Sequence, residues 1–471
     1  MSLMARGIVV LILLTVALVA HGLQTSSPVQ ANAVRQQQKR GGFPHHRISS
    51  TTRVRDDADV QVVSAAQTPP PPPSGEQRQL LANAISLVAG TTVGAGILAL
   101  PAVAAEAGFV PSTIALLGSW VFMATTGLLI AEVCCNLVKK DPGNANIGIL
   151  SMAKKTLGPV GAAGAGAVYL FIHYALLVAY IAEAGDIISD SAHLPAWAGP
   201  ALFTGAIGGT LAFGTEQAIA AVNNVFVAVV VVAFAGLIAL GLPSVDLSNL
   251  ARQDFPAVLK TVPVMFVALV YHNVVPVVCA QLKYNVQQIR VAITVGSLIP
   301  LAMFVAWNFV ILGIAAPGAV AADPVAVLRN GGAGGATGAL VSLFSEAAIV
   351  TSFIGFVIGL VDFFTDVFPD RSKKDRLLYG AVLVPPLVVA LLDPNIFRGA
   401  LEYAGTFGIS ILFGAVPALM AWKTRADSKV AAPAKKGNQK QAYDVVVPGG
   451  PAALALVLLG AAVVIGQKLL A

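Results

Sequence analysis

Long apolar runs separated by short polar segments fill the chain from residue 82 to residue 468. A helix needs about 20 mainly apolar residues to cross the hydrocarbon core of a bilayer. The pattern therefore predicts eleven membrane-spanning helices, of which the fourth and the ninth are the shortest. Their ranges are 82–104, 111–137, 161–183, 198–214, 219–242, 260–281, 290–315, 339–364, 377–392, 401–421 and 450–468.

The first and sixth spans carry residues that interrupt helices near mid-depth. The first contains Gly94, Ala95 and Gly96, and the sixth contains Pro263 and Pro276 around a polar group at 271–273. Backbone groups released from a helix are tolerated at that depth only when protein or a cavity surrounds them. Small residues can also serve as a packing face for another helix. Corresponding interruptions five spans apart favour an inverted-repeat transporter whose substrate lies between the two breaks.

Composition agrees with a membrane protein: 56% of the residues are hydrophobic and 11% are charged, whereas soluble domains average roughly 25% charged residues. The net charge is +6, but the basic residues lie in an N-terminal leader and in loops, so we expect no nucleic-acid partner. Their distribution predicts the orientation, because basic residues concentrate on the cytoplasm-like side. We call the side where the first span begins the inner side.

Inner loops hold seventeen basic residues: Arg78, Lys139, Lys140, Lys154, Lys155, Lys283, Arg290, Arg371, Lys373, Lys374, Arg376, Lys423, Arg425, Lys429, Lys435, Lys436 and Lys440. Outer segments hold five: Arg252, Lys260, Arg329, Arg398 and Lys468. A miscounted span would scramble this alternation, so the asymmetry supports both the span count and the orientation.

The N-terminal leader is expected to lie outside the fold. Residues 1–22 have the pattern of a signal peptide, and residues 23–78 form a basic, transit-like and proline-rich segment. Such a bipartite leader resembles those of proteins sent to the plastid envelope of algae with secondary plastids. Ordinary insertion through the secretory pathway, into the plasma membrane or an endomembrane, is the alternative. The transporter core is then 79–425, followed by a polar loop at 426–449 and the eleventh span at 450–471.

Several polar residues inside the spans are candidates for chemistry. An intramembrane ionisable residue is a functional candidate by default, which applies to His272, flanked by Tyr271 and Asn273. His173 and Tyr174 lie at mid-depth in the third span and could meet substrate from the side or simply bond another helix.

Near the inner end of the second span, Glu132 is a candidate proton relay; the alternative is a carboxylate that reaches the interface. Free backbone N–H groups at the breaks suit a carboxylate, and free carbonyls suit an ammonium group or a coupling cation.

Sequence motifs across 80–425 resemble the tryptophan/tyrosine permease family. They include GTTVGAGILALP in span one, FVALVYHNVVPVVCAQL in span six and FSEAAIVTSFIGFVIGLVDFF in span eight. The resemblance implies an all-α, leucine-transporter-type fold of two inverted five-helix repeats plus one extra helix. It also implies proton-coupled transport of tryptophan or tyrosine, with Gly94, Ala95, Gly96 and 271–273 as the unwound parts.

By the same resemblance, Thr351 and Ser352 stand where related sodium-coupled transporters bind a cation with span-eight hydroxyl groups. They could instead bond back to their own helix. A sodium-coupled or broader neutral amino acid carrier is therefore the alternative function.

Two other function classes fit less well. A channel usually shows pore-lining charge rings or filter loops, and paired breaks argue against one. A membrane enzyme would need convergent catalytic groups, and the sequence shows no nucleotide-binding loop, catalytic triad or metal-ligand cluster. We therefore expect no cofactor and no metal, only an amino acid substrate, protons or sodium ions, and the lipid bilayer.

Overall fold

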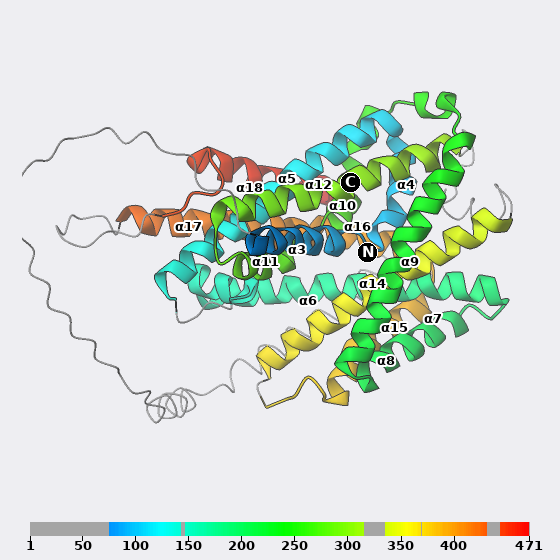
Figure 1. The fold of residues 1–471 in the computed structure, drawn as a ribbon, viewed down its shortest axis with the longest axis horizontal. Coiled ribbons are helices and arrows are strands. Elements are labelled where there is room, and N and C mark those ends of the chain that lie inside the picture. Colours follow the sequence, from blue (N-terminus) through cyan, green and yellow to red (C-terminus); the bar gives the residue numbers. More distant parts are fainter. Residues whose placement is uncertain (1–74, 143–146, 315–334, 369, 431–442, 471) are drawn as a thin grey trace, which may run out of the picture.

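The computed structural model describes residues 75–142, 147–314, 335–368, 370–430 and 443–470. Within these ranges every regular element is a helix (Figure 1). The helices of six residues or more are α3 Gly75–Thr92, α4 Gly96–Ala107, α5 Phe109–Lys140, α6 Ile149–Ala192, α7 Ala198–Phe203, α9 Glu216–Gly241, α10 Val258–Ala268, α11 Val275–Gln281, α12 Val286–Ile314, α14 Gly335–Val367, α15 Arg376–Leu392, α16 Phe397–Tyr403, η8 Ala404–Ala415, α17 Val416–Val430 and α18 Gly450–Leu470. The predicted signal peptide and most of the transit-like segment lie outside the described residues.

The described part contains eight helices long and apolar enough to cross a membrane, and a bent pair, α3 with α4, that makes a ninth. Two shorter apolar helices, Ala198–Phe213 and Arg376–Leu392, coincide with the fourth and ninth predicted spans. Each of the eleven predicted segments is thus helical, and this arrangement fits an integral membrane protein. That all eleven segments cross the membrane, and that the first ten form two inverted five-helix repeats, stay predictions.

The predicted interruption of span one is confirmed. Helix α3 ends at Thr92, α4 begins at Gly96, and the two axes differ in direction by 59°. The hydroxyl groups of Thr91 and Thr92 donate to the carbonyls of Leu87 and Val88, at 2.7 and 2.8 Å. These threonines therefore bond back within α3 as it ends, and the break itself consists of residues 93–95.

Span six is also interrupted, at a slightly different place from the prediction. Helix α10 ends at Ala268, a single 3-10 turn covers His272–Val274, and α11 starts at Val275. Pro276 lies in the first turn of α11, where a missing N–H costs nothing, so it starts the second half-helix. The irregular backbone therefore runs from Leu269 to Tyr271.

Helix α6, which runs along the length of the molecule in Figure 1, begins earlier than predicted, at Ile149. Gly158 has a φ of +77°, and Pro159 follows it, so the helix is kinked there. A proline can open a new helical run, and a glycine tolerates the left-handed backbone before it. Gly158 therefore separates two helical segments of α6, and the segment that starts at Pro159 contains the predicted span 161–183.

Span ten departs from α-helical geometry through η8, a π-helical stretch over Ala404–Ala415. Such wide turns often occur at functional positions. At its start, Gly405 lies so close to the carbonyl of Pro263 in α10 that a Cβ would fall under 3.0 Å from that oxygen. The absence of a side chain at Gly405 therefore lets span ten touch the backbone of span six.

Candidate functional site

The break in span one is held by span eight. The backbone N–H of Ala95 donates to the hydroxyl oxygen of Ser352 in α14, 3.0 Å away. Gly94 lies against the same hydroxyl, and a Cβ there would be under 3.0 Å from Ser352 Oγ. Ser352 thus satisfies a backbone donor that has left the helical ladder, which fits the rule that buried donors find partners.

The two interrupted spans meet at their breaks. A Cβ on Gly96, the first residue of α4, would lie 2.7 Å from the Cα of Ala268, the last residue of α10. Only glycine permits this approach. The positive N-terminal end of α4 therefore adjoins the negative C-terminal end of α10, and a zwitterion needs both ends.

Of the two span-eight hydroxyl groups, only Ser352 contacts the break. The Thr351 hydroxyl donates to the carbonyl of Ala348, 3.0 Å away in its own helix. Tyr180 in α6, which is 3% exposed, lies near Ser352 from span three. Sequence reasoning missed Tyr180, although it follows His173 by seven residues and so shares its helix face.

His173 and Tyr174 direct their hydrogen bonds elsewhere. His173 Nδ1 donates to the carbonyl of Tyr169 at 2.8 Å, and the two rings stack 3.9 Å apart. The Tyr174 hydroxyl donates at 2.8 Å to the carbonyl of Ala381 in span nine. Both side chains are buried, but these His173 contacts lie within α6 and the Tyr174 contact joins spans three and nine, so neither reaches the breaks. Their substrate-binding role stays a prediction.

At the break of span six, Tyr271 and His272 pack against span two. The Tyr271 hydroxyl donates to the Met123 carbonyl at 3.2 Å, beside Gly127, where a Cβ would lie 2.5 Å from that hydroxyl oxygen. His272 Nε2 lies 2.8 Å from the hydroxyl oxygen of Thr126. Both residues are almost completely buried, whereas the neighbouring Asn273 is exposed and its substrate-binding role stays a prediction.

The Thr126 hydroxyl lies 2.8 Å from His272 Nε2 and 3.1 Å from the Met123 carbonyl, which can only accept. When the Thr126 proton goes to that carbonyl, Nε2–H donates to Thr126 and Nδ1 keeps its lone pair; when it goes to Nε2, Nδ1 carries the hydrogen. In both tautomers Nδ1 is buried without a hydrogen-bond partner, so an unpaired ring nitrogen lies at the break of span six.

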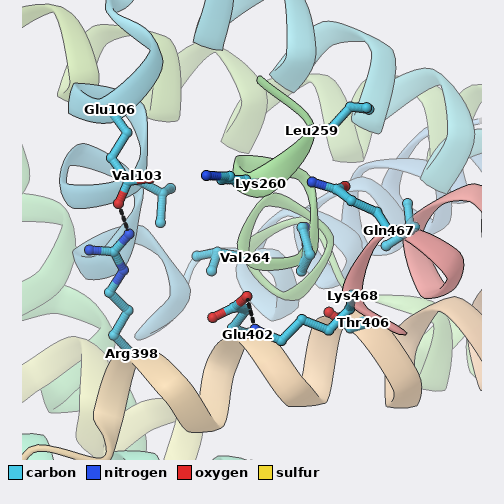
Figure 2. A pocket seen from close by; sticks show the side chains of 12 residues that line it. Val103, Glu106, Leu259, Lys260, Val264, Arg398, Glu402, Thr406, Gln467 and Lys468 are labelled. Carbon is cyan, nitrogen blue, oxygen red and sulfur yellow. Dashed lines mark hydrogen bonds and ion pairs between the residues drawn. The ribbon is translucent and has the colours of Figure 1, made fainter. Parts of the chain in front are cut away.

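A cavity of about 240 Å³ opens at the opposite, predicted outer, ends of α4 and α10 (Figure 2). The start of α16 and the end of α18 complete its wall. Its charged lining residues are Glu106, Lys260, Arg398, Glu402 and Lys468. It includes neither break. No group of three or more His, Cys, Asp or Glu residues suited to a metal occurs in the part of the chain that the structure describes.

The family model that matches this chain is the tryptophan/tyrosine permease family, over residues 77–467. That range runs from the first turn of α3 almost to the end of α18. The chain belongs to this family. It is therefore a permease-family protein rather than an enzyme.

Several relatives of this permease are named as tyrosine or tryptophan transport proteins. Tyrosine-specific transport systems 1 and 2 of Haemophilus influenzae are 31% and 30% identical to it, over 72% and 73% of this chain and 87% of each relative. The tryptophan-specific transport protein of Pseudomonas aeruginosa is 29% identical, over 74% of this chain and 87% of the relative.

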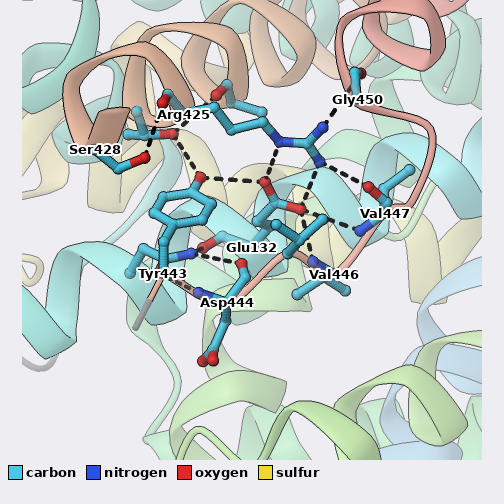
Figure 3. Close-up of polar contacts among 12 residues, drawn as sticks. Glu132, Arg425, Ser428, Tyr443, Asp444, Val446, Val447 and Gly450 are labelled. Atoms are coloured by element: carbon cyan, nitrogen blue, oxygen red, sulfur yellow. Dashed lines mark hydrogen bonds and ion pairs between the residues drawn. The ribbon is translucent and has the colours of Figure 1, made fainter. Parts of the chain in front are cut away.

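In this permease Glu132 forms a buried ion pair at the predicted inner end of span two (Figure 3). Its side chain is 0% exposed, and the Arg425 guanidinium donates to both of its oxygens, at 2.6 and 2.8 Å. The Tyr443 hydroxyl donates to one oxygen at 3.1 Å, and the N–H groups of Val446 and Val447 donate to the other at 2.8 and 3.1 Å. Five donors therefore converge on the two oxygens of this carboxylate.

The Glu132 contacts tie residues 443–447, just before α18, to the ends of spans two and ten. Asn136 exchanges hydrogen bonds with the backbone of Asp444, and Arg290 of span seven donates to the carbonyls at 445 and 446. Burial raises the pKa of the Tyr443 phenol, which keeps it a donor. The geometry favours a structural clamp, and the proton-relay role of Glu132 stays a prediction that none of these contacts supports.

Proposed function

We propose that this protein is a secondary active transporter of aromatic amino acids, tyrosine or tryptophan, that binds its substrate between the breaks of spans one and six. The observation that carries the proposal is the contact of Gly96 with Ala268, which brings the ends of the two half-helices together. The names of the relatives supply the substrate class. Alternating access would follow from movement of one repeat against the other around this point.

The helix ends at the two breaks offer backbone donors and acceptors that are complementary to the carboxylate and ammonium groups of an amino acid. The Ala95 N–H, at the N-terminal side of α4, would donate to the substrate carboxylate in place of the Ser352 hydroxyl. Carbonyls at the C-terminal end of α10 would accept from its ammonium group. Tyr180 lies near Ser352, so we assign it a positioning role.

The coupling ion that we propose is the proton, bound at His272 Nδ1. A charged imidazole is costly where it is buried, so its proton needs a nearby counter-charge. The ring's described neighbours, Thr126, Tyr271 and Phe413, supply none. A bound substrate carboxylate would supply it, so proton and amino acid would bind cooperatively. Glu132 is less suited, because five donors already occupy its two oxygens.

Sodium coupling fits the present geometry less well. A cation beside Thr351 and Ser352 needs oxygen atoms that face it. Ser352 instead accepts from the N–H of Ala95, whose positive end would repel a cation, and Thr351 bonds to its own helix.

Uptake into proteoliposomes tests this proposal. We expect labelled tyrosine and tryptophan to accumulate under an imposed pH gradient, with saturation, and a sodium gradient alone to have no effect. Accumulation that follows sodium and ignores pH would disprove proton coupling. Flux without saturation would disprove a carrier.

His272→Gln is the matched variant for the proton site. The glutamine amide can still donate to Thr126 but cannot bind a proton at physiological pH. We expect it to exchange labelled for unlabelled tyrosine across the membrane but to lose accumulation driven by pH. Full pH-driven accumulation by this variant would remove His272 from the coupling mechanism.

The destination of the protein is a separate proposal, carried by the leader alone. We propose the plastid envelope of an alga with secondary plastids. Residues 1–78 fused to a fluorescent protein should direct it to the plastid of such a host, and fluorescence at the plasma membrane would contradict this.

A further inference from the structure

The outer cavity combines charges and a buried hydroxyl in a way that the proposed transport mechanism does not use. It lies between α4 and α10, the two half-helices that leave the breaks toward the predicted outer side, and is closed by α16 and α18 (Figure 2). Residues from five helical elements, α4, α10, α16, η8 and α18, therefore face one space that is separate from the breaks.

Two ion pairs neutralise most of the charge around the cavity. Arg398 pairs with Glu106, and Lys468 pairs with Glu402 at 2.7 Å. Lys260 lines the same cavity and forms no ion pair with any residue that the structure describes. In the view of Figure 2 its ammonium group lies between the two pairs. The cavity thus offers one free positive charge to a ligand.

Both carboxylates keep acceptor capacity. Glu106 and Glu402 each use Oε1 in their ion pairs. A carboxylate has roughly four lone-pair sites, so each can still accept from an ammonium group of a ligand. A free cation beside two such carboxylates is complementary to a zwitterion.

Thr406 supplies the second, independent observation. Its side chain lines the cavity and is 0% exposed, yet its hydroxyl has no hydrogen-bond partner. An unsatisfied buried hydroxyl is unfavourable, and a polar ligand atom in the cavity would satisfy it. The rest of the wall is apolar except for the amide of Gln467, and Val103, Leu259, Pro263, Val264 and Val464 suit an apolar side chain.

We propose that this cavity is a second amino acid binding site, distinct from the site at the breaks. The ligand carboxylate binds Lys260, its ammonium group binds the free oxygens of Glu106 and Glu402, and its apolar side chain lies on the valine and leucine wall. Because the ligand bridges α4, α10 and α18, its occupancy couples the outer halves of spans one and six to span eleven.

The identity of the ligand as an amino acid rests on the transport function proposed above. A zwitterionic or anionic lipid headgroup shares part of the same chemistry, so the experiment must separate the two sources.

Equilibrium binding of labelled tyrosine and tryptophan to the purified, full-length protein in detergent tests the proposal. We expect two bound molecules per protein, and one in Lys260→Gln, whose outer-site affinity should fall about tenfold or more because a charge-assisted contact is lost. Thr406→Val should weaken the same site several-fold while leaving the protein at least as heat-stable, since it removes an unsatisfied hydroxyl. Lys140→Gln, at the opposite end of the molecule, is the control and should bind two.

Three results would overturn the second site. One is a single bound molecule in the wild type with transport intact, which leaves the proposed function standing. Another is a second binding event that Lys260→Gln and Thr406→Val leave unchanged. The third is a phospholipid that co-purifies with the wild type, is lost from Lys260→Gln and prevents the second amino acid from binding, which would assign the cavity to a lipid headgroup. Absence of both binding and transport would instead refute the proposed function.

Discussion

The contact between spans one and eight leads to a quantitative prediction. In Gly94→Ala the new Cβ falls under 3.0 Å from Ser352 Oγ, closer than Cβ atoms are found in real structures. The next nearest atom is Ser352 Cβ, at 3.7 Å, which is an ordinary van der Waals distance. The clash is therefore with one oxygen atom alone, and Ser352→Ala removes that atom.

These distances set the expected free energies. If Ser352 stays in place, Gly94→Ala should lower the free energy of unfolding by about 1–3 kcal/mol, the usual cost of overpacking. If Ser352 rotates away, the protein still loses the hydrogen bond to Ala95, worth about 1 kcal/mol. Ser352→Ala alone should also cost about 1 kcal/mol through that lost bond. The double variant should be no less stable than Ser352→Ala, so the two effects should not add.

The assay is unfolding in detergent of the wild type, the two single variants and the double variant, with tyrosine uptake measured in parallel. Gly90→Ala is the control, because a Cβ there meets no atom within 4 Å, and it should unfold like the wild type or be slightly more stable. Distant, independent sites add within about 0.5 kcal/mol. If the double variant loses the sum of the two single effects within that error, the contact between Gly94 and Ser352 is refuted.

Two further predictions concern packing and the clamp. Gly405→Ala should sharply reduce the yield of folded protein, because its Cβ would meet the backbone carbonyl of Pro263. Gly118→Ala is the control, because a Cβ there meets open space, and it should express normally. Equal yields of the two variants would contradict the close approach of spans six and ten. Glu132→Gln should cost about 1–3 kcal/mol of stability, because it leaves the partly buried Arg425 without its ion-pair partner. Tyr443→Phe should cost about 1–2 kcal/mol, because it removes the hydrogen bonds to Glu132 and Thr424. Thermal unfolding measures both, and wild-type stability of Glu132→Gln would contradict the clamp.

Local features of the fold were predictable from the sequence. Apolar length predicted a helix in every one of the eleven segments, and glycine predicted the interruption of span one, because backbone freedom is a property of the residue itself. The prolines did not mark the interruption of span six, since Pro263 lies inside α10 and Pro276 in the first turn of α11. The predicted start of span three, at 161, lies just after the non-helical Gly158, and the helix at 149–157 that precedes Gly158 was not predicted. Pro276 was misread as a breaker because a proline in a first helical turn looks the same in sequence.

Contacts between distant residues were not predictable. The sequence left Thr351 and Ser352 equivalent, and only packing shows that Ser352 meets the break. Glu132 was interpreted as a possible relay because Arg425 lies 293 residues away in sequence. Tyr180 was overlooked because one tyrosine in an apolar helix carries no local signal of its partner.

Counterflow across a proteoliposome membrane tests the central claim most directly. Vesicles that contain the protein are loaded with unlabelled tyrosine and diluted into a trace of labelled tyrosine, with no ion gradient. A carrier that exposes one site alternately to each side should give a transient accumulation of label above its equilibrium level. A monotonic rise to equilibrium, at the same rate with or without tyrosine inside, would contradict alternating access at the breaks of spans one and six.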